Sequence, residues 1–437
     1  MELMQSGRNT SVSTGLTTTS TLRVADLPSF LPSASHNCLA SSPIDHVQWY
    51  SWWVHDQVQR EPKELFSSLP GYDPKSNQHY TDPFTALWQE TSRYLAAKES
   101  VSILEIVTHL VEEGLLQSQS GAEALVSAKN LVFAVIGWQT MLYKPDMHSC
   151  PAGQLAIADE MDGHQGQAHM CLKQNGSACK RHIHELLLGF GVLLPPRNFH
   201  APASPEDNAA FNELKTAAPA TFNAHLLTSI GGIDIKWTDS LACHLEFDKN
   251  SNTLFLYRYP SFCVAHLPPS KSTTPHKTVI HACAAPDTAG TKQWATADEV
   301  TQMLREIILS YRLLFGQNKA ARQRFRKLRP FDDIPAEGTD NLLSSLCGRK
   351  HCQSTFDIPE RETYDLPRDF PVLRSRLAIL LRHLSNRKPR TWKELWQDKR
   401  DSASWLTFWA VLIIGGMGII LAFLQVVLQI VQIVQRD

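Results

Sequence analysis

The chain has 437 residues, and its 42 Lys and Arg against 43 Asp and Glu leave a formal charge of −1. No nucleic-acid recognition motif accompanies its basic residues, so nucleic acid is not expected as a partner. Its nine cysteines are odd in number and scattered along a long chain, so a disulfide framework is not expected. The charge is uneven, because residues 301–437 hold 22 Lys and Arg against 14 Asp and Glu, a balance of +8 that leaves −9 for residues 1–300.

The chain begins with a segment that we expect to be disordered, residues 1–40. Ser, Thr, Gly and Asn dominate residues 6–21, and such a tract buries too little apolar surface to offset the entropy lost on ordering it. No long apolar run lies near Met1, so the sequence predicts no secretory signal peptide.

Residues 46–330 are predicted to form a mainly helical domain. Aromatic side chains around Trp49 mark its start, and apolar residues recur at helical spacing from Ser102 to Leu116. Further helices are expected over residues 84–98, 121–143, 205–230 and 296–327.

The strongest strand pattern lies near residues 241–259 and predicts one β-hairpin. Apolar and polar side chains alternate from Leu241 to Phe247, turn-forming residues follow, and an apolar, aromatic run continues from Thr253 to Tyr259. In this alternation His244 falls among the polar positions, so we expect it at the surface.

Residues 331–404 are predicted to form a loop followed by a basic amphipathic segment beside the membrane anchor. An apolar face runs from Val372 to Leu384 and either packs on the domain or lies on lipid headgroups. Just before this region, six basic residues fall within residues 319–329, where they form a solvated helix end or contact lipid. They are Lys319, Arg322, Arg324, Arg326, Lys327 and Arg329.

From Trp405 to Val434 the chain has no charged side chain, and we predict a transmembrane helix over these residues. The part that ends at Leu424 would alone rise about 30 Å as a helix, the thickness of a bilayer's hydrocarbon core. Trp405, Phe408 and Trp409 form an aromatic cluster at its start, which is typical of a membrane interface.

Basic residues before this helix predict its orientation. A group of them precedes the helix, whereas Arg436 is the one that follows it. The positive-inside rule then places the N-terminal bulk in the cytosol, a tail-anchored topology with the anionic cytoplasmic leaflet as lipid partner. The long anchor favours the endoplasmic reticulum or another endomembrane over the mitochondrion. The preceding basic residues are Arg387, Lys388, Arg390, Lys393, Lys399 and Arg400.

Small and amide side chains follow one another along the predicted membrane helix. Gly418 and Ala422 form a small-xxx-small pair, and Gln425 and Gln429 continue at helical spacing. Either these residues face another helix in the bilayer, or the helix leaves the bilayer after Leu424 and continues as an amphipathic segment.

Residues 144–184 hold the densest group of His and Cys side chains. Zinc sites use such ligands, but the short C-x2-C spacing that brings two ligands together in one turn is missing. A flexible polar loop is the favoured interpretation, and a zinc site is the alternative. The residues are His148, Cys150, His164, His169, Cys171, Cys179, His182 and His184.

One catalytic arrangement is considered near the hairpin. Cys263 or Ser261 would act as the nucleophile, His244 as the base and Asp239 as the carboxylate that orients it, and such a triad requires hydrogen-bond contact between successive members. No G-x-S-x-G, P-loop, strand-linked G-x-G-x-x-G or H-E-x-x-H motif supports catalysis elsewhere in the chain.

Several motifs carry a resemblance that covers the chain from Gly231 to its end. They are Trp237–Asp248 (W-x-D-S-L-x-x-H-L-E-F, then Asp), Tyr259–Cys263 (Y-P-S-F-C), Ser310–Gly316, Lys388–Trp392, Asp398–Asp401 and Trp405–Trp409 (W-x-T-F-W). This region resembles a family of filamentous-fungal, single-pass, C-terminally anchored membrane proteins. The resemblance implies a topology and a fungal source, but no reaction. The C-terminus is also similar to magnesium channels, but those carry two helices and a Gly-Met-Asn loop, which this chain lacks.

Together, these features predict an α+β fold: a mainly helical cytosolic domain with one β-hairpin, plus one C-terminal transmembrane helix. The expected function is that of a membrane-tethered accessory or adaptor protein without catalysis or cofactor of its own. A membrane-bound enzyme using Cys263, His244 and Asp239 is the first alternative, and an ion-conducting oligomer subunit is the second.

Overall fold

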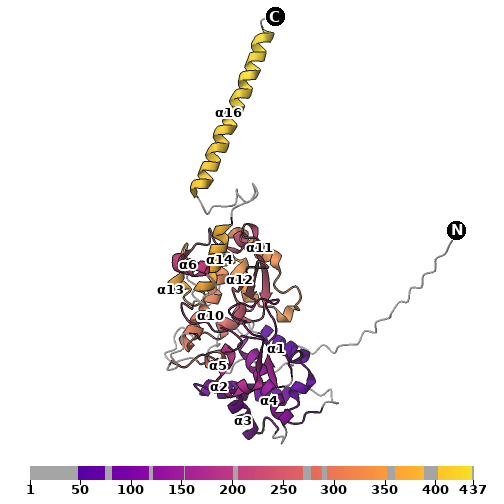
Figure 1. Cartoon of the computed structure of the whole chain (residues 1–437). Coiled ribbons are helices and arrows are strands. Elements are labelled where there is room, and N and C mark those ends of the chain that lie inside the picture. The colour runs from indigo at the N-terminus through magenta and orange to yellow at the C-terminus, as the bar shows by residue number, and fades with distance from the viewer. Residues whose placement is uncertain are drawn as a thin grey trace, which may run out of the picture.

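The structure, a computed structural model, shows a folded domain and a long C-terminal helix, α16 (Ser402–Val434), that projects from it (Figure 1). It describes residues 48–73, 81–117, 122–151, 153–199, 205–268, 277–287, 293–351, 360–387 and 402–435. The predicted disorder of residues 1–40 lies outside the described residues. Most of the basic residues expected beside the anchor also lie outside the described residues, namely Lys388, Arg390, Lys393, Lys399 and Arg400.

The structure is about 56% helical, which confirms a mainly helical α+β fold. The first part of the domain contains α1 (Gln48–Arg60), α2 (Thr81–Ala97), α3 (Ile103–Glu112), α4 (Ala122–Thr140) and α5 (Ile183–Leu188). The second part contains α6 (Pro205–Glu213), α7 (Ala224–Ser229), α8 (Pro260–Ala265), α9 (Val279–Ala282), α10 (Ala297–Tyr311), α11 (Lys319–Leu328), α12 (Asn341–Gly348), α13 (Leu366–Asp369) and α14 (Arg374–Asn386).

Two of the expected helices are each split in the structure. The helix predicted over 296–327 is α10, a π-helical turn over Arg312–Gly316, and then α11, because Asn318 caps a new helix by accepting two backbone N–H groups. The helix predicted over 205–230 is α6 and α7, since the side chain of Asn223 likewise caps α7. A polar side chain that accepts hydrogen bonds from the backbone can begin a new helix, and the spacing of apolar residues does not predict such a break.

Within the described residues, three small sheets replace the single predicted hairpin. In the largest, β6 (Thr253–Tyr257) pairs antiparallel with β5 (Phe247–Asp248) and parallel with β4 (Asp234–Thr238). The hairpin is therefore shorter than predicted and has a parallel strand beside it. The two-stranded sheets pair β1 (Gln154–Ala156) with β2 (Lys173–Asn175) and β3 (Thr216–Ala217) with β7 (Tyr364–Asp365).

The segment before β5 is not the half-exposed strand that its alternation predicts. Leu241–Cys243 form a 3₁₀ turn, and every residue from Leu241 to Phe247 is buried. The expectation that His244 lies at the surface is wrong, because this turn packs on both sides and the imidazole bonds to two buried neighbours.

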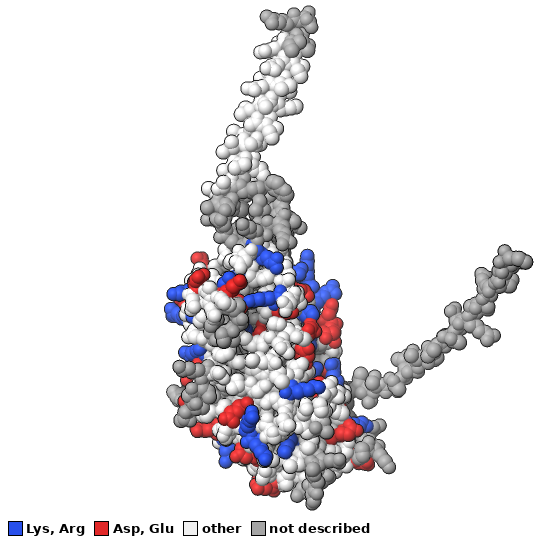
Figure 2. All heavy atoms as spheres, viewed as in Figure 1, with Lys and Arg blue, Asp and Glu red and all other residues white. Residues whose placement is uncertain are grey.

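The apolar core extends through α14 and stops there. Leu377, Leu380 and Leu384 are buried in the same core as the helices of the first part, so the apolar face predicted over 372–384 packs on the domain. In α16, by contrast, large apolar side chains such as Ile414 and Ile419 are exposed. Figure 2 shows this helix as a column without the blue and red of charged residues that cover the domain.

Candidate functional site

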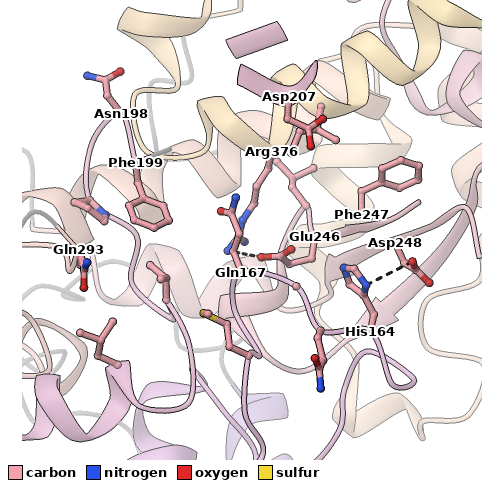
Figure 3. Close-up of a pocket in the computed structure, with 18 of the residues that line it drawn as sticks. His164, Gln167, Asn198, Phe199, Asp207, Glu246, Phe247, Asp248, Gln293 and Arg376 are labelled. Carbon is pink, nitrogen blue, oxygen red and sulfur yellow. Dashed lines mark ion pairs between the residues drawn. The ribbon is translucent and has the colours of Figure 1, made fainter. Parts of the chain in front are cut away.

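A cavity of about 1370 Å³ opens on one side of the domain and is the candidate functional site (Figure 3). Its wall comes from the loop around Gln167, from β5 and the turn after it, and from α6 and α14. The volume exceeds the 300–1,000 Å³ range of ordinary small-molecule sites, so the cavity has room for a drug-sized molecule.

The wall of the cavity contains a buried ion pair between Glu246 and Arg376. Arg376 Nη2 lies 2.9 Å from Glu246 Oε1, and the two side chains are 4% and 6% exposed. Arg376 Nη1 donates to the carbonyl of Ala242 at 2.8 Å and to that of His244. The 3₁₀ turn before β5 therefore aims two carbonyl groups at the guanidinium and holds Arg376 in place.

Arg376 retains unused hydrogen-bonding capacity. Its Nη2 is close to Glu246, but no acceptor lies in the direction of an Nη2–H bond, and the atom is shielded from water. The contact is thus an electrostatic pairing without a satisfied hydrogen bond at that nitrogen. A buried donor in this condition destabilises the domain unless another group accepts from it.

The loop that carries Gln167 is held by backbone contacts. Ala168 N donates to Glu246 Oε1 at 3.0 Å, and Val192 N donates to the carbonyl of Gln167 at 2.8 Å. Gly191 adopts φ +150°, and a Cβ there would lie 2.2 Å from the carbonyl oxygen of Ala168. Glycine is therefore required for the loop to pack this closely.

Other charges in the wall are also paired with each other. Lys249 Nζ donates to both carboxylate oxygens of Asp207 at 2.6 Å, and His164 Nδ1 lies 3.5 Å from Asp248 Oδ1. Lys249 and Asp207 thus neutralise each other. Arg197, which also lines the cavity, is an exception, because it forms no ion pair with a described residue.

The three residues proposed as a triad have other partners in the structure. His244 Nε2 donates to Ser310 Oγ at 2.8 Å while its Nδ1 accepts from Tyr257 N at 3.2 Å, and burial lowers the pKa of His244 to about 3. Asp239 accepts from Trp53 Nε1 at 3.0 Å and pairs with Arg258. His244 therefore stays neutral and makes structural contacts.

The two candidate nucleophiles are equally enclosed. Burial raises the pKa of the Cys263 thiol well above its usual value, so the thiolate is disfavoured. Ser261 Oγ accepts from Trp49 Nε1 at 2.7 Å, and its backbone N–H donates to Asp340. No hydrogen bond joins either nucleophile to His244 among the described residues.

The His and Cys residues of 144–184 do not gather into a metal site. Within the described part of the chain, no three His, Cys, Asp or Glu side chains are placed to hold a metal ion. The eight residues lie in different surroundings: His148 bonds to the carbonyl of Arg60, His164 lies at the cavity, and Cys179 is buried in the core.

One contact in this region was not predicted from the sequence. Cys243 Sγ lies 3.6 Å from His169 Nε2, and both side chains are buried. Burial lowers the pKa of His169 to about 4 and raises that of Cys243, so the pair is neutral rather than thiolate and imidazolium. The two residues are far apart in sequence, and no spacing motif links them.

The predicted membrane helix is one continuous helix in the structure. Among the described residues, one helix is long and apolar enough to cross a membrane, Trp409–Gln432, with 24 residues of which none is buried. Trp405 and Phe408 belong to α16, and Trp409 is partly exposed. Gly418, Ala422, Gln425 and Gln429 lie within this helix, at spacings that place them on one face. The last described residue before the gap that precedes α16 is Arg387, which is half-buried.

Comparison of the chain with protein-family models, with curated proteins and with solved structures finds no match.

Proposed function

We propose that this protein is a membrane-tethered accessory or adaptor protein without catalysis of its own, anchored by α16 with its folded domain in the cytosol. The observation that carries the proposal is the exposed apolar span Trp409–Gln432. Its 24 residues rise about 36 Å at 1.5 Å per residue, enough to cross a hydrocarbon core of about 30 Å. Water disfavours an apolar surface of this length, and a bilayer removes that cost.

The charge on either side of the helix supports the proposed orientation. Basic residues from Arg387 to Arg400 precede the span, and Arg436 follows it, so the N-terminal side belongs in the cytosol. The same basic residues suit the anionic cytoplasmic leaflet. We assign the anchor to the endoplasmic reticulum or another endomembrane, and the resemblance to fungal membrane proteins agrees with this topology.

The surroundings of the proposed triad support the adaptor over the enzyme. Cys263, His244 and Asp239 each contact structural neighbours. Burial raises the pKa of the Cys263 thiol, which disfavours the thiolate, and lowers the pKa of His244, which makes its neutral imidazole a weak base. A pore formed by one span per chain requires several copies of α16, for which Gly418 and Ala422 are the contact residues to test.

Topology is tested first. A glycosylation acceptor placed after Asp437 is expected to be modified, because that end would face the lumen, and a matched acceptor before Gln48 is expected to stay unmodified. The intact chain should also resist extraction by alkaline carbonate, whereas a chain ending at Ser404 should be released. Extraction of the intact chain by carbonate would refute the anchor.

The adaptor role is tested by proximity labelling from the N-terminus in the native cells. We expect the intact chain to label a set of membrane proteins that the chain ending at Ser404 does not reach. An identical set for both chains would show that the anchor does not select the neighbours. Conductance by the purified chain in liposomes would instead support the pore.

The preformed cavity favours a second function, the binding of a small molecule. Glu246 and Arg376, and likewise Asp207 and Lys249, are paired with each other in its wall, whereas the side chains of Gln167 and Gln293 make no hydrogen bond with a protein group in the described parts of the chain. Amides both donate and accept, and apolar groups such as Ile379 line the remaining wall. We propose a polar molecule with several hydrogen-bonding groups.

Native mass spectrometry of the intact protein from its native cells tests this second function. The protein is expected to retain a small molecule that Ile379→Trp, which places a bulky indole in the cavity wall, displaces. Leu125→Trp on the exposed side of α4 is the control and should retain it. If the wild type and both variants each show only the mass of their own polypeptide, the cavity carries no tightly held ligand.

A further inference from the structure

The surface built by α11 and the end of α12 is strongly basic. It contains no Asp or Glu over residues 319–331 or 341–351. Ala321 and Phe325 are buried and fix α11 to the domain, so its basic side chains face outward. We name this surface the basic face. It comprises Lys319, Arg322, Arg326, Lys327, Arg329, Arg349 and Lys350.

Contacts within the protein hold the two parts of the basic face together. Arg326 Nη2 donates to the carbonyl of Gly348 at 3.5 Å and links α11 to the end of α12. The buried Arg312 donates to the carbonyls of Arg349 at 2.9 Å and Lys350 at 2.7 Å, which fixes their backbone while both side chains remain exposed.

The charges of the basic face remain largely without acidic partners. Among the described residues, one of these seven side chains lies within 4 Å of a carboxylate: Arg329 Nη1 is 3.4 Å from Asp332 Oδ2. Both of these side chains are exposed, and exposed pairs contribute little free energy. The face therefore attracts an external anionic surface.

The basic face lies at the end of the domain from which the chain leaves for α16. His383 in the last turn of α14 bonds to the carbonyl of Gly231 at 2.9 Å, directly after α7, and α11 packs against the same α7. Figure 1 shows α11, α12 and α14 together at the end nearer α16, with α3 at the opposite end. In Figure 2, blue side chains gather at the upper right of the domain, in the region of α11.

The connecting segment keeps this end near the bilayer. Residues 388–401 span at most about 50 Å even when fully extended. A tether of this length raises the effective concentration of lipid headgroups at the basic face. Each Lys or Arg near an anionic leaflet then strengthens the contact about fivefold.

We propose that the basic face docks on anionic phospholipid headgroups, so that the anchored domain rests against the membrane. This inference depends on the proposed membrane anchor. Lipid fits the face better than nucleic acid does, because Phe325, the aromatic side chain of α11, is buried and so offers no stacking surface to bases.

Lysine footprinting of the intact chain in nanodiscs tests the proposal. The chain is placed in phosphatidylcholine discs and in discs with 30% phosphatidylserine, and acetylation of each lysine is followed by mass spectrometry. We expect Lys319, Lys327 and Lys350 to react at least threefold more slowly in the phosphatidylserine discs, and 0.5 M NaCl to remove the difference. The exposed Lys63 and Lys180, which lie outside the basic face, are matched controls and should react equally in both.

The outcomes separate the inference from the anchor. Equal rates in both discs, with the chain incorporated, would overturn the docking and leave the anchor intact. Failure of the chain to enter either disc would overturn both. Protection of the three lysines by added RNA but not by phosphatidylserine would assign the face to nucleic acid and refute the lipid proposal.

Discussion

Glu306 is a buried carboxyl that joins the core to the helix leading out of the domain. It lies on α10, and its oxygens accept from Val372 N at 3.1 Å and from Leu373 N at 2.7 Å, just before α14. Burial raises the pKa of Glu306 to about 8, although these backbone hydrogen bonds lower it in part. The side chain is therefore protonated in the folded domain over a wide range of pH.

This shift makes the stability of the domain depend on pH. Since the folded pKa lies above the ordinary value of 4.5, the stabilising contribution of Glu306 is fully present below about pH 4.5 and is lost as the pH rises through about 8. Each unit of pKa difference corresponds to about 1.4 kcal/mol. Between pH 5 and pH 8 the unfolding free energy should fall by up to about 4 kcal/mol through this group.

Glu306→Gln removes the titration and keeps the size of the side chain. The amide presents a donor where backbone N–H groups already point, so the variant should be about 1–3 kcal/mol less stable at pH 5. Its deficit relative to the wild type should shrink or reverse by pH 8. Urea unfolding of the intact chain in nonionic detergent, followed by tryptophan fluorescence, measures this difference.

An exposed carboxyl provides the control. Glu337→Gln should leave the pH dependence unchanged, because Glu337 is exposed to water. If the curves for wild type and Glu306→Gln run parallel from pH 5 to pH 8, Glu306 does not titrate in that range, and burial does not raise its pKa as inferred.

Three further substitutions test other parts of the structure. Arg376→Met leaves Glu246 buried and unpaired and should lower the unfolding free energy by about 3–5 kcal/mol, measured by the same urea titration. Ser261→Ala removes the acceptor of a buried indole N–H and should cost about 1–3 kcal/mol; an unchanged midpoint would contradict this contact. Gly418→Leu should weaken association of α16 in a reporter assay of helix pairing in membranes, whereas Gly416→Leu, on the opposite face, should not; equal signals would exclude the Gly418 face.

Local sequence predicted those elements whose causes lie within a few neighbouring residues. The residues of the capping boxes of α3 and α10 lie in the first turn of the helix that each begins. The long uncharged run of α16 likewise indicates a helix without any contact with the domain. The apolar pattern did not predict where two of the expected helices are interrupted, because the side chains of Asn223 and Asn318 cap new helices there. Capping competes with periodicity, and a pattern of apolar residues does not show which prevails.

The candidate site was beyond the reach of local sequence. Glu246 and Arg376 pair although they lie 130 positions apart in the chain, and the alternation around His244 suggested a surface strand where the structure has a buried turn. Such contacts arise because the whole core excludes water from one place, and a buried charge then requires whichever partner the packing supplies.

The sequence alone determined that the chain has an apolar helix beside a basic segment. The tertiary structure decided which charges are buried together, where a cavity remains, and which face carries unpaired positive charge, since these depend on residues distant in the chain.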